Sequence, residues 1–192
     1  MKIAFAADPL AGFKIYKDST YAMMAEAARR GHSIFVFQHK DMAFEGGKVV
    51  ANFSRVILTG GGQEDWYRQE EPVAQELTGF DAILERTDPP FNMEYIYATY
   101  LLELAQQQGA RVFNKPEAIR SFNEKLAIAQ FPQYIAPTLV TADAKRVRAF
   151  HEEHRDIILK PLDGMGGAGI FRVKDCLLYT SPSSRDRQKS RM

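Results

Sequence analysis

The sequence has few of the residues on which disulfides, metal–thiolate centres and membrane contacts depend. Cys176 is the only cysteine among 192 residues, and positive and negative side chains nearly balance, with a net charge of +1. A single cysteine excludes a disulfide within the chain and a metal–thiolate site. The small net charge argues against a nucleic-acid-binding surface, and no apolar run reaches the length of a membrane span. We expect a cytoplasmic protein with no nucleic acid and no membrane as partner.

Several familiar catalytic signatures are missing too. The glycine-rich stretch near the C-terminus lacks the Gly-x-x-x-x-Gly-Lys-Ser/Thr pattern of a P-loop, and a strand is expected after it at residues 170–173, where a Rossmann fingerprint requires a helix. His151 and His154 have a spacing that could serve a metal ion. Their neighbours are charged, which favours a solvated helix end instead: Glu152, Glu153 and Arg155.

The first part of the chain alternates between strand and helix patterns. Residues 2–7 form a short apolar run, which predicts a strand. Asp18 can cap a helix that runs to Arg30, and Gly31 stops it before a second apolar run at residues 33–37. A strand–helix–strand order predicts neighbouring parallel strands joined by a helical crossover.

The next elements extend this alternation to about residue 120. They are a hairpin within residues 41–58, a strand at 81–87, a helix at 92–108 and a strand at 111–114. The apolar face expected for the helix consists of Tyr97, Tyr100, Leu101 and Leu104. Together these elements predict a doubly wound α/β domain.

The composition shifts after residues 114–116, where a second domain is expected to begin. Its predicted elements are a short helix at 116–122, a helix to residue 130, an extended run at 138–141, a helix to residue 154 capped by Asp143, and strands at 157–162 and 170–173. These residues are too few to close a core of their own. We therefore expect residues 1–122 to be one domain and 123–175 the beginning of another.

A glycine-rich run separates the last two expected strands. Four glycines fall within six residues: Gly164, Gly166, Gly167 and Gly169. Neither a helix nor a strand interior tolerates this density, whereas exposed amide N–H groups can surround an anion such as a nucleotide phosphate. A purely structural turn is the alternative.

Two lysines bear on that choice. Lys160 alternates with apolar residues in the expected strand, so we expect it to be buried beneath the glycine run and to need an anionic partner. The alternative is an edge-strand lysine that faces solvent. Lys125 opens a helix expected to end near Gln130, and its position alone indicates an exposed side chain.

Two charged residues follow strands of the expected parallel sheet. Asp8 ends the first strand, and Arg86 lies at the carboxyl end of the strand at 81–87. Open α/β sheets place ligands at these ends, and a guanidinium can hold a carboxylate through paired N–H groups. A salt bridge from Arg86 to Glu85 or Asp88 is the structural alternative.

Several strings, taken together and in order, resemble bacterial glutathione synthetase, a ligase of the ATP-grasp superfamily. They are DPPF from residue 88, YIYATY from 95, NKP from 114, NEK from 123 and LKPLDGMGG from 159. The resemblance covers about residues 1–174 and departs from the family in the glycine-rich loop at 60–62. It implies an α/β fold, with a doubly wound, Rossmann-like pre-ATP-grasp domain followed by the truncated start of an α+β ATP-grasp domain.

The same resemblance implies an ATP-dependent carbon–nitrogen ligase with γ-glutamylcysteine, glycine and ATP as partners and Mg²⁺ or Mn²⁺ as the metal. The peptide carboxylate attacks the γ-phosphate of ATP, and glycine opens the acyl phosphate to give glutathione, ADP and phosphate. The residues implied at ATP are Lys125, Lys160, Gly164, Met165, Gly166 and Gly167. Asp8 and Arg86 are expected to help hold the peptide. Metal ligands are expected beyond residue 174, and the full-length protein could be a homo-oligomer.

Two other functions stay open at this point. One is a different ATP-grasp ligase that joins another carboxylate to an amine. The other is a non-catalytic nucleotide-binding α/β domain in which the glycine run is only a turn.

The last residues, 176–192, differ from the rest, with four basic residues, one acidic residue and serines around Pro182. This segment resembles a translated sequencing-library adaptor, with Ser184 where the usual form has proline. We therefore expect a disordered, non-native tail and a gene interrupted near Asp175. On this hypothesis the fragment neither coordinates the catalytic metal nor turns over, and ADP release by the purified chain with all three substrates would refute it.

Overall fold

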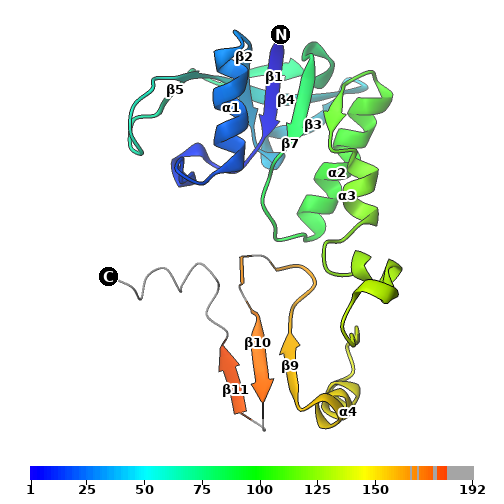
Figure 1. Ribbon diagram of the computed structural model, residues 1–192. Helices are drawn as coiled ribbons and strands as arrows, with labels where there is room; N and C mark the ends of the chain where they lie inside the picture. Colours follow the sequence, from blue (N-terminus) through cyan, green and yellow to red (C-terminus); the bar gives the residue numbers. More distant parts are fainter. Residues whose placement is uncertain (165, 168, 175–176, 181–192) are drawn as a thin grey trace. The chain divides into compact units, whose positions relative to one another are not determined.

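The computed structural model describes residues 1–164, 166–167, 169–174 and 177–180, which form two compact units (Figure 1). The first unit comprises Met1–Asp88 and Asn92–Ser121, and the second comprises Pro89–Phe91 and the chain from Phe122 onward. Pro89–Phe91 leave the first unit, so the second is built from two chain segments. No helix in the described part of the chain combines the length and the apolar character that crossing a bilayer requires.

A parallel core lies at the centre of the first unit. β1 pairs in parallel with β2 on one side and with β7 on the other, and β7 pairs in parallel with β8. These four strands are β1 (Lys2–Ala6), β2 (Ser33–Phe37), β7 (Ala82–Glu85) and β8 (Val112–Phe113). Helix α1 (Ser19–Arg29) connects β1 to β2, and α2 (Met93–Gln107) connects β7 to β8. The α/β, doubly wound class predicted from the sequence is confirmed.

The two faces of this sheet are covered by different helices, as Figure 1 shows. Side chains alternate along β1, so Ala4 and Ala6 enter one apolar cluster with Leu102 of α2. Phe5 points to the other face and joins Met24 of α1 in a second cluster. Strands buried on both faces explain why β1 reads as a continuous apolar run rather than an alternating one.

The edge beyond β2 is antiparallel and is built on one long strand. β4 (Lys48–Leu58) pairs with β2 and forms the expected hairpin with β3 (Met42–Glu45), in which Glu45 lies opposite Lys48. Two short strands that the sequence did not predict, β5 (Tyr67–Gln69) and β6 (Val73–Glu76), also pair with β4. The main path of the sheet is therefore β3-β4-β2-β1-β7-β8.

Helix α2 begins next to Asn92, as expected, and of its expected apolar face only Leu101 and Leu104 pack against the core. Asn92 caps it by accepting a hydrogen bond from the Tyr95 amide at 3.0 Å. Tyr97 and Tyr100 are 60% and 54% exposed, so their expected place in the apolar face was wrong. Small side chains allow the helix to approach the strands closely, and its buried residues are Ala98, Thr99, Leu102 and Ala105. The Arg120 guanidinium, from α3 (Pro116–Ser121), covers the Tyr100 ring at 4.3 Å.

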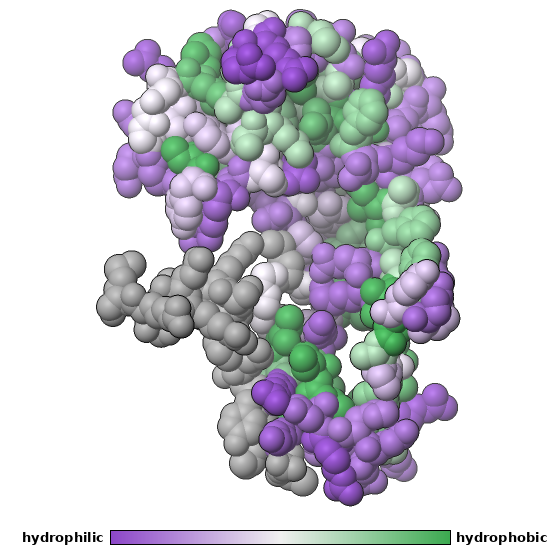
Figure 2. Space-filling view, viewed as in Figure 1, coloured by the Kyte–Doolittle hydropathy of each residue, from purple (hydrophilic) through white to green (hydrophobic). Residues whose placement is uncertain are grey.

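The described part of the second unit contains the α-helix α4 (Ala144–His154) and the antiparallel strands β9 (Asp156–Leu159), β10 (Phe171–Lys174) and β11 (Leu177–Thr180). The α-helix expected to end at residue 130 was wrong, because a 3₁₀ turn stands there. Residues 138–141, expected to be extended, belong to no helix and pair with no described strand. In Figure 2, apolar side chains gather over β9 and β10, where Ile158 is 56% exposed. The 3₁₀ turns of the two units are Leu10–Gly12, His39–Asp41, Leu77–Gly79, Ala127–Gln130 and Pro132–Tyr134.

The segment expected to be a disordered tail is only partly described. Leu177–Thr180 form β11, which pairs with β10 in the register Lys174 opposite Leu177. Residues 181–192 lie outside the described residues.

Candidate functional site

Asn123 organises the segment that carries Lys125 in the second unit. Its carboxamide oxygen accepts hydrogen bonds from the backbone amides of Lys125 and Leu126, both at 3.0 Å. Its side-chain nitrogen donates to the carbonyl of Leu162 at 3.1 Å. The backbone amide of Phe91 donates to the neighbouring Asp163 carbonyl at 3.3 Å. One asparagine thus ties this segment to the chain that enters the glycine-rich turn.

Lys125 reaches the glycine-rich turn itself. Its ammonium donates a hydrogen bond to the carbonyl of Gly164 and forms an ion pair with Glu124 at 2.6 Å. The side chain is 18% exposed, so the exposed position expected from its place in the sequence was wrong. The contact with Gly164 joins residues 39 positions apart, and local spacing carries no signal for it.

The glycine-rich turn connects β9 to β10 and adopts a backbone that favours glycine. Gly166 and Gly167 have φ angles of 64° and 89°, in the left-handed region that side-chain-bearing residues seldom adopt. Met165, expected at the nucleotide, lies outside the described residues. Successive amides in such a turn can face an anion, which suits the chemistry expected here.

Lys160 lies one residue beyond the end of β9, at Leu159, and it is exposed. The expectation of a buried strand lysine beneath the turn was therefore wrong. The strand ends early because Pro161 follows, and a proline has no N–H to continue the ladder with β10. Among the described residues, the Lys160 ammonium makes no hydrogen bond or ion pair, so its charge is available to a ligand.

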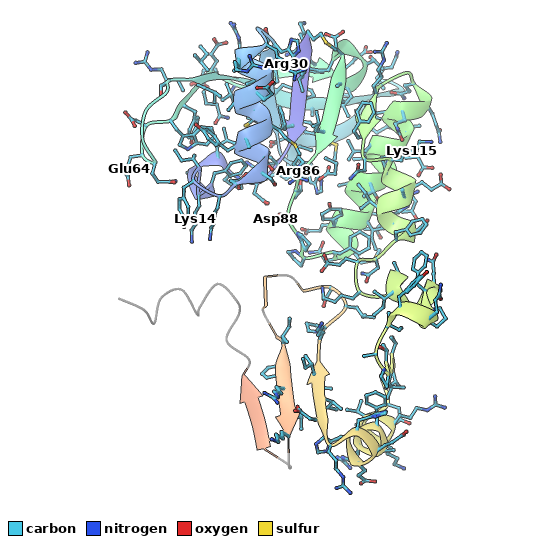
Figure 3. The ribbon with its side chains drawn as sticks, viewed as in Figure 1. Lys14, Arg30, Glu64, Arg86, Asp88 and Lys115 are labelled. Carbon is cyan, nitrogen blue, oxygen red and sulfur yellow. The ribbon has the colours of Figure 1, made fainter. Side chains whose placement is uncertain are left out.

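Arg86 follows β7 in the first unit and is held by the start of α1 (Figure 3). Its Nε donates to the hydroxyl of Thr20 at 3.1 Å, and a terminal nitrogen donates to the hydroxyl of Ser19 at 2.9 Å. Its backbone amide donates to the carbonyl of Ala6 at 2.8 Å, which extends the pairing of β7 with β1. The guanidinium is therefore fixed in place by neutral partners, and it keeps its positive charge.

Asp8 lies beside the same strand ends. Its carboxylate accepts a hydrogen bond from the backbone amide of Asp88 at 2.9 Å. The helices that follow β1 and β7 cover opposite faces of the sheet, so the crevice between these strand ends is the point where α/β folds of this type bind ligands. The structure thus brings Asp8 and Arg86 to the same edge of the sheet, at neighbouring strands.

A buried cluster of polar side chains, which the sequence did not predict, lies at the end of β7. Glu85, whose side chain is 1% exposed, lies 3.0 Å from Nε2 of His39 and accepts a hydrogen bond from the Thr87 amide at 2.9 Å. The Tyr95 hydroxyl donates to the Thr87 carbonyl at 3.2 Å. Burial raises the pKa of the Tyr95 phenol, and the carboxylates of Glu85, Asp8 and Asp88 raise it further. The one sequence signal for this cluster was its position at the carboxyl end of an expected parallel strand, where α/β sheets bind ligands.

The described residues offer no ready metal centre. Within residues 1–164, 166–167, 169–174 and 177–180, no three His, Cys, Asp or Glu side chains gather closely enough to hold a metal ion. His154 instead packs its ring against Phe150, with centroids 4.3 Å apart at the end of α4. We therefore assign no metal ligand to this part of the chain.

Comparison with known protein families accounts for nearly all of this chain. Residues 1–120 match the model described as the N-terminal domain of prokaryotic glutathione synthetase, and residues 124–178 match the model of its ATP-grasp domain. Among solved structures, the ATP-grasp ligase PsnB complexed with minimal precursor aligns with a TM-score of 0.45 and 22% identity, over 90% of this chain and 56% of that chain.

Curated relatives agree with the family models. The glutathione synthetase of Ralstonia nicotianae is 60% identical over 173 residues, which cover 90% of this chain and 53% of that protein. The glutathione synthetase of Neisseria meningitidis serogroup B is 53% identical over 178 residues, which cover 91% of this chain and 56% of that protein. The chain thus spans about half the length of these relatives. With both family models matched in order along its length, this chain belongs to the prokaryotic glutathione synthetase family.

Proposed function

We propose that this chain is part of a cytoplasmic glutathione synthase, which joins γ-glutamylcysteine to glycine at the expense of ATP. The observation that carries the proposal is the glycine-rich turn with the Lys125 ammonium at its Gly164 carbonyl, in a chain of this family. Residues 1–122 act as the substrate domain and 123–175 as the beginning of the ATP-grasp domain. A homo-oligomer of the complete protein is part of the same proposal.

The reaction proceeds through two displacements. A carboxylate oxygen of γ-glutamylcysteine attacks the γ-phosphorus of ATP, and the bond to the β,γ-bridging oxygen breaks to release ADP. The amine of glycine then attacks the acyl carbon, phosphate leaves, and the nitrogen loses a proton as the amide forms. Both steps depend on charge neutralisation and alignment, because the protein has little covalent chemistry to perform.

The glycine-rich turn and the two lysines are proposed to bind ATP. Lys125 and Lys160 provide positive charge, and the backbone amides of the turn provide donors that do not need to reorient. A closed turn would also exclude water, which would otherwise hydrolyse the acyl phosphate. The residues in this role are Lys125, Lys160, Gly164, Met165, Gly166 and Gly167.

The strand-end pair of the first unit is proposed to hold the peptide. The Arg86 guanidinium, fixed by the hydroxyls of Ser19 and Thr20, can bind a carboxylate of γ-glutamylcysteine. Asp8 can accept a hydrogen bond from an ammonium on the same substrate. Mg²⁺ is the proposed metal of the complete enzyme, but the described residues do not gather into a metal site and we derive no step through it.

A chimaeric enzyme tests the proposal. The matched 173 residues of the Ralstonia nicotianae glutathione synthetase are replaced with those of this chain, and ADP release is measured with and without each substrate. We expect release that requires both γ-glutamylcysteine and glycine. Lys125→Ala and Lys160→Ala should each lower kcat/KM for ATP by roughly 100-fold, because a phosphate loses a charged partner. Lys145→Ala, at an exposed lysine of the same unit, is the matched control.

The peptide assignment is tested separately in the same enzyme. Arg86→Lys keeps the charge but loses the planar pair of donors, so KM for γ-glutamylcysteine should rise about tenfold while KM for ATP stays constant. ADP release that depends on another carboxylate donor would indicate a different ATP-grasp ligase. Nucleotide binding without turnover would indicate a non-catalytic domain.

A further inference from the structure

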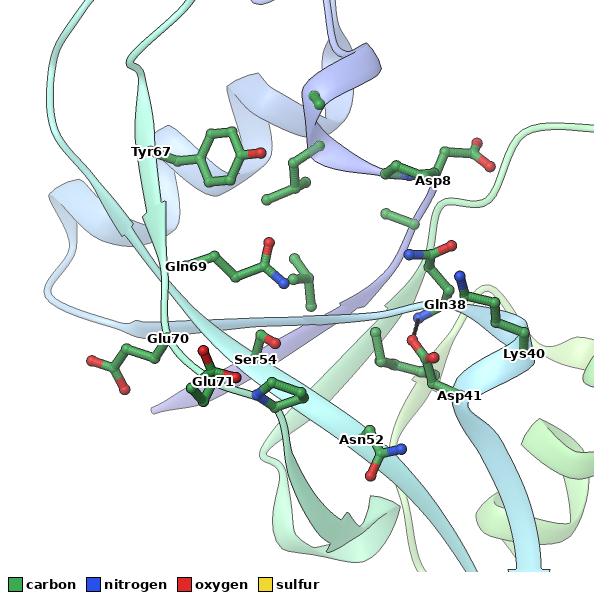
Figure 4. Close-up of a pocket in the computed structure, with 17 residues that line it drawn as sticks. Asp8, Gln38, Lys40, Asp41, Asn52, Ser54, Tyr67, Gln69, Glu70 and Glu71 are labelled. Atoms are coloured by element: carbon green, nitrogen blue, oxygen red, sulfur yellow. Dashed lines mark hydrogen bonds between the residues drawn. The ribbon is translucent and has the colours of Figure 1, made fainter.

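A pocket of about 480 Å³ opens in the first unit, on the side of β1 away from β7. Figure 4 shows it between the segments that follow β1 and β2 and the antiparallel strands β4 and β5. Its volume lies in the range of small-molecule sites. The pocket belongs to the first unit alone, contains none of the residues assigned above to ATP, and borders the proposed peptide site through Asp8.

The pocket lies where one of the two edges of β4, the one opposite β2, has a gap in its strand pairing. β6 pairs with β4 as far as Phe53, and β5 pairs with it again from Val56. Between them the chain touches β4 through the amide of Glu70, which donates to the carbonyl of Arg55 at 2.9 Å, and Pro72 has no N–H to add another bond. The side chains at this interruption therefore border a hollow rather than a packed strand.

A serine side chain without a protein partner among the described residues lines this hollow. Ser54 is 4% exposed, lies opposite Val36 of β2 and contributes to the pocket wall. Its hydroxyl makes no hydrogen bond with any described residue and borders the open volume of the pocket. A side chain that borders an open volume and lacks a protein partner points to a bound molecule that supplies one.

The side chains that line the pocket carry a net negative charge, which favours a positively charged ligand. Four carboxylates line the pocket, those of Asp8, Asp41, Glu70 and Glu71, against a single ammonium, that of Lys40. Figure 4 places Glu70 and Glu71 at one end and Asp8 and Asp41 at the other. Glu71 forms no ion pair with a described residue, and Glu70 has only a 3.6 Å contact with Arg55. An occupant with positive charge at both ends would neutralise this excess.

We propose that this pocket binds a small organic polyammonium ion, a diamine or polyamine with ammonium groups separated by a short methylene chain. One ammonium meets the Glu71 end, the other meets the Asp8 end, and the Ser54 hydroxyl accepts a hydrogen bond from an N–H of the ligand. The Tyr67 hydroxyl and the Gln69 carboxamide, which point inward from β5 in Figure 4, offer further polar partners. The apolar walls, which include Leu10, Val36 and Pro72, suit the methylene chain.

Isothermal titration of the 192-residue chain with spermidine tests the proposal, and it requires no ligase activity. We expect one binding site per chain. Glu71→Gln and Ser54→Ala should each weaken binding about fivefold, because each removes one partner of an ammonium. Glu64→Gln removes one negative charge of the same unit outside the pocket and serves as the matched control, with unchanged affinity.

Two results of the titration would contradict the proposed polyammonium site. An absence of heat with spermidine would overturn it, as would equal weakening by Glu71→Gln and Glu64→Gln, which would indicate attraction to the overall charge. Succinate, a dianion of comparable length, should not compete. Glu71 is exposed, so its variant is expected to fold even if Ser54→Ala does not.

Discussion

Nε2 of His39 lies 3.0 Å from Oε2 of Glu85, with side-chain exposures of 15% and 1%. The contact joins the turn after β2 to the end of β7, two strands that are separated by β1. The other carboxylate oxygen of Glu85 accepts the Thr87 amide, so both oxygens are bonded. This buried group fixes the backbone on either side of Arg86.

Removing the carboxylate of Glu85 should destabilise the first unit strongly. In Glu85→Ala, the Thr87 amide loses its partner and the His39 ring keeps only its 3.1 Å contact with the Thr87 hydroxyl, which costs about 2–4 kcal/mol. Trp66 is the only tryptophan of the chain and is buried in this unit, so its fluorescence during urea unfolding reports the unit's stability. Glu76→Ala is the matched control: its 3.5 Å ion pair with Lys48 is half exposed and is worth about 0.5 kcal/mol. Equal losses of unfolding free energy in Glu85→Ala and Glu76→Ala would show that the buried contacts of Glu85 contribute no more than an exposed ion pair.

The caps Asp18 and Asp143 should act independently because they lie in different units. Asp18 accepts hydrogen bonds from the amides of Thr20 at 2.7 Å and Tyr21 at 3.0 Å. Asp18→Ala should therefore lower the stability reported by Trp66 by about 1 kcal/mol. Asp143, which accepts from the Lys145 amide at 2.8 Å, caps α4 in the second unit. Asp143→Ala should leave the Trp66 transition unchanged, and a shift of the same size would show that the units unfold together.

The first unit should lose stability in alkaline solution through Tyr95. The folded protein holds the phenol proton more tightly than the unfolded chain, whose reference pKa is 10.0, since burial and nearby carboxylates raise the folded pKa. Above pH 10 the unfolded chain releases a proton that the folded unit keeps, so stability falls by up to about 1.4 kcal/mol per pH unit. Urea midpoints measured by Trp66 fluorescence between pH 8 and pH 11 should show this decline. Tyr95→Phe should flatten the decline, and an identical slope in both proteins would exclude Tyr95 as its source.

Local chemistry determined many of the elements in advance. Asp18 and Asp143 cap the helices expected after them, and the hairpin turn places Glu45 opposite Lys48. Short-range signals of this kind need only a few neighbouring residues, which the sequence displays directly. The glycine run also marked the turn between β9 and β10, because few other residues adopt its backbone.

Side-chain surroundings were less accessible to prediction. The period of α2 suggested that Tyr97 and Tyr100 face the sheet, yet the tyrosines are exposed and the buried face is centred on Leu102 and Ala105. Lys160 was expected to be buried and is exposed, whereas Lys125 was expected to be exposed and reaches Gly164. In each case the burial depends on which distant segment packs there, and helical or strand periodicity does not encode that choice.

The sequence by itself determined the alternation of strands and helices, the caps that start the helices and the family strings that identify the chain. Only the tertiary structure decided that β5 and β6 complete the edge of β4, that His39 meets Glu85 and that Ser54 borders an open pocket. The physical reason is the range of the interactions. Backbone conformation follows from residues a few positions apart, whereas pairing, burial and charge neutralisation depend on groups that only the folded chain brings together.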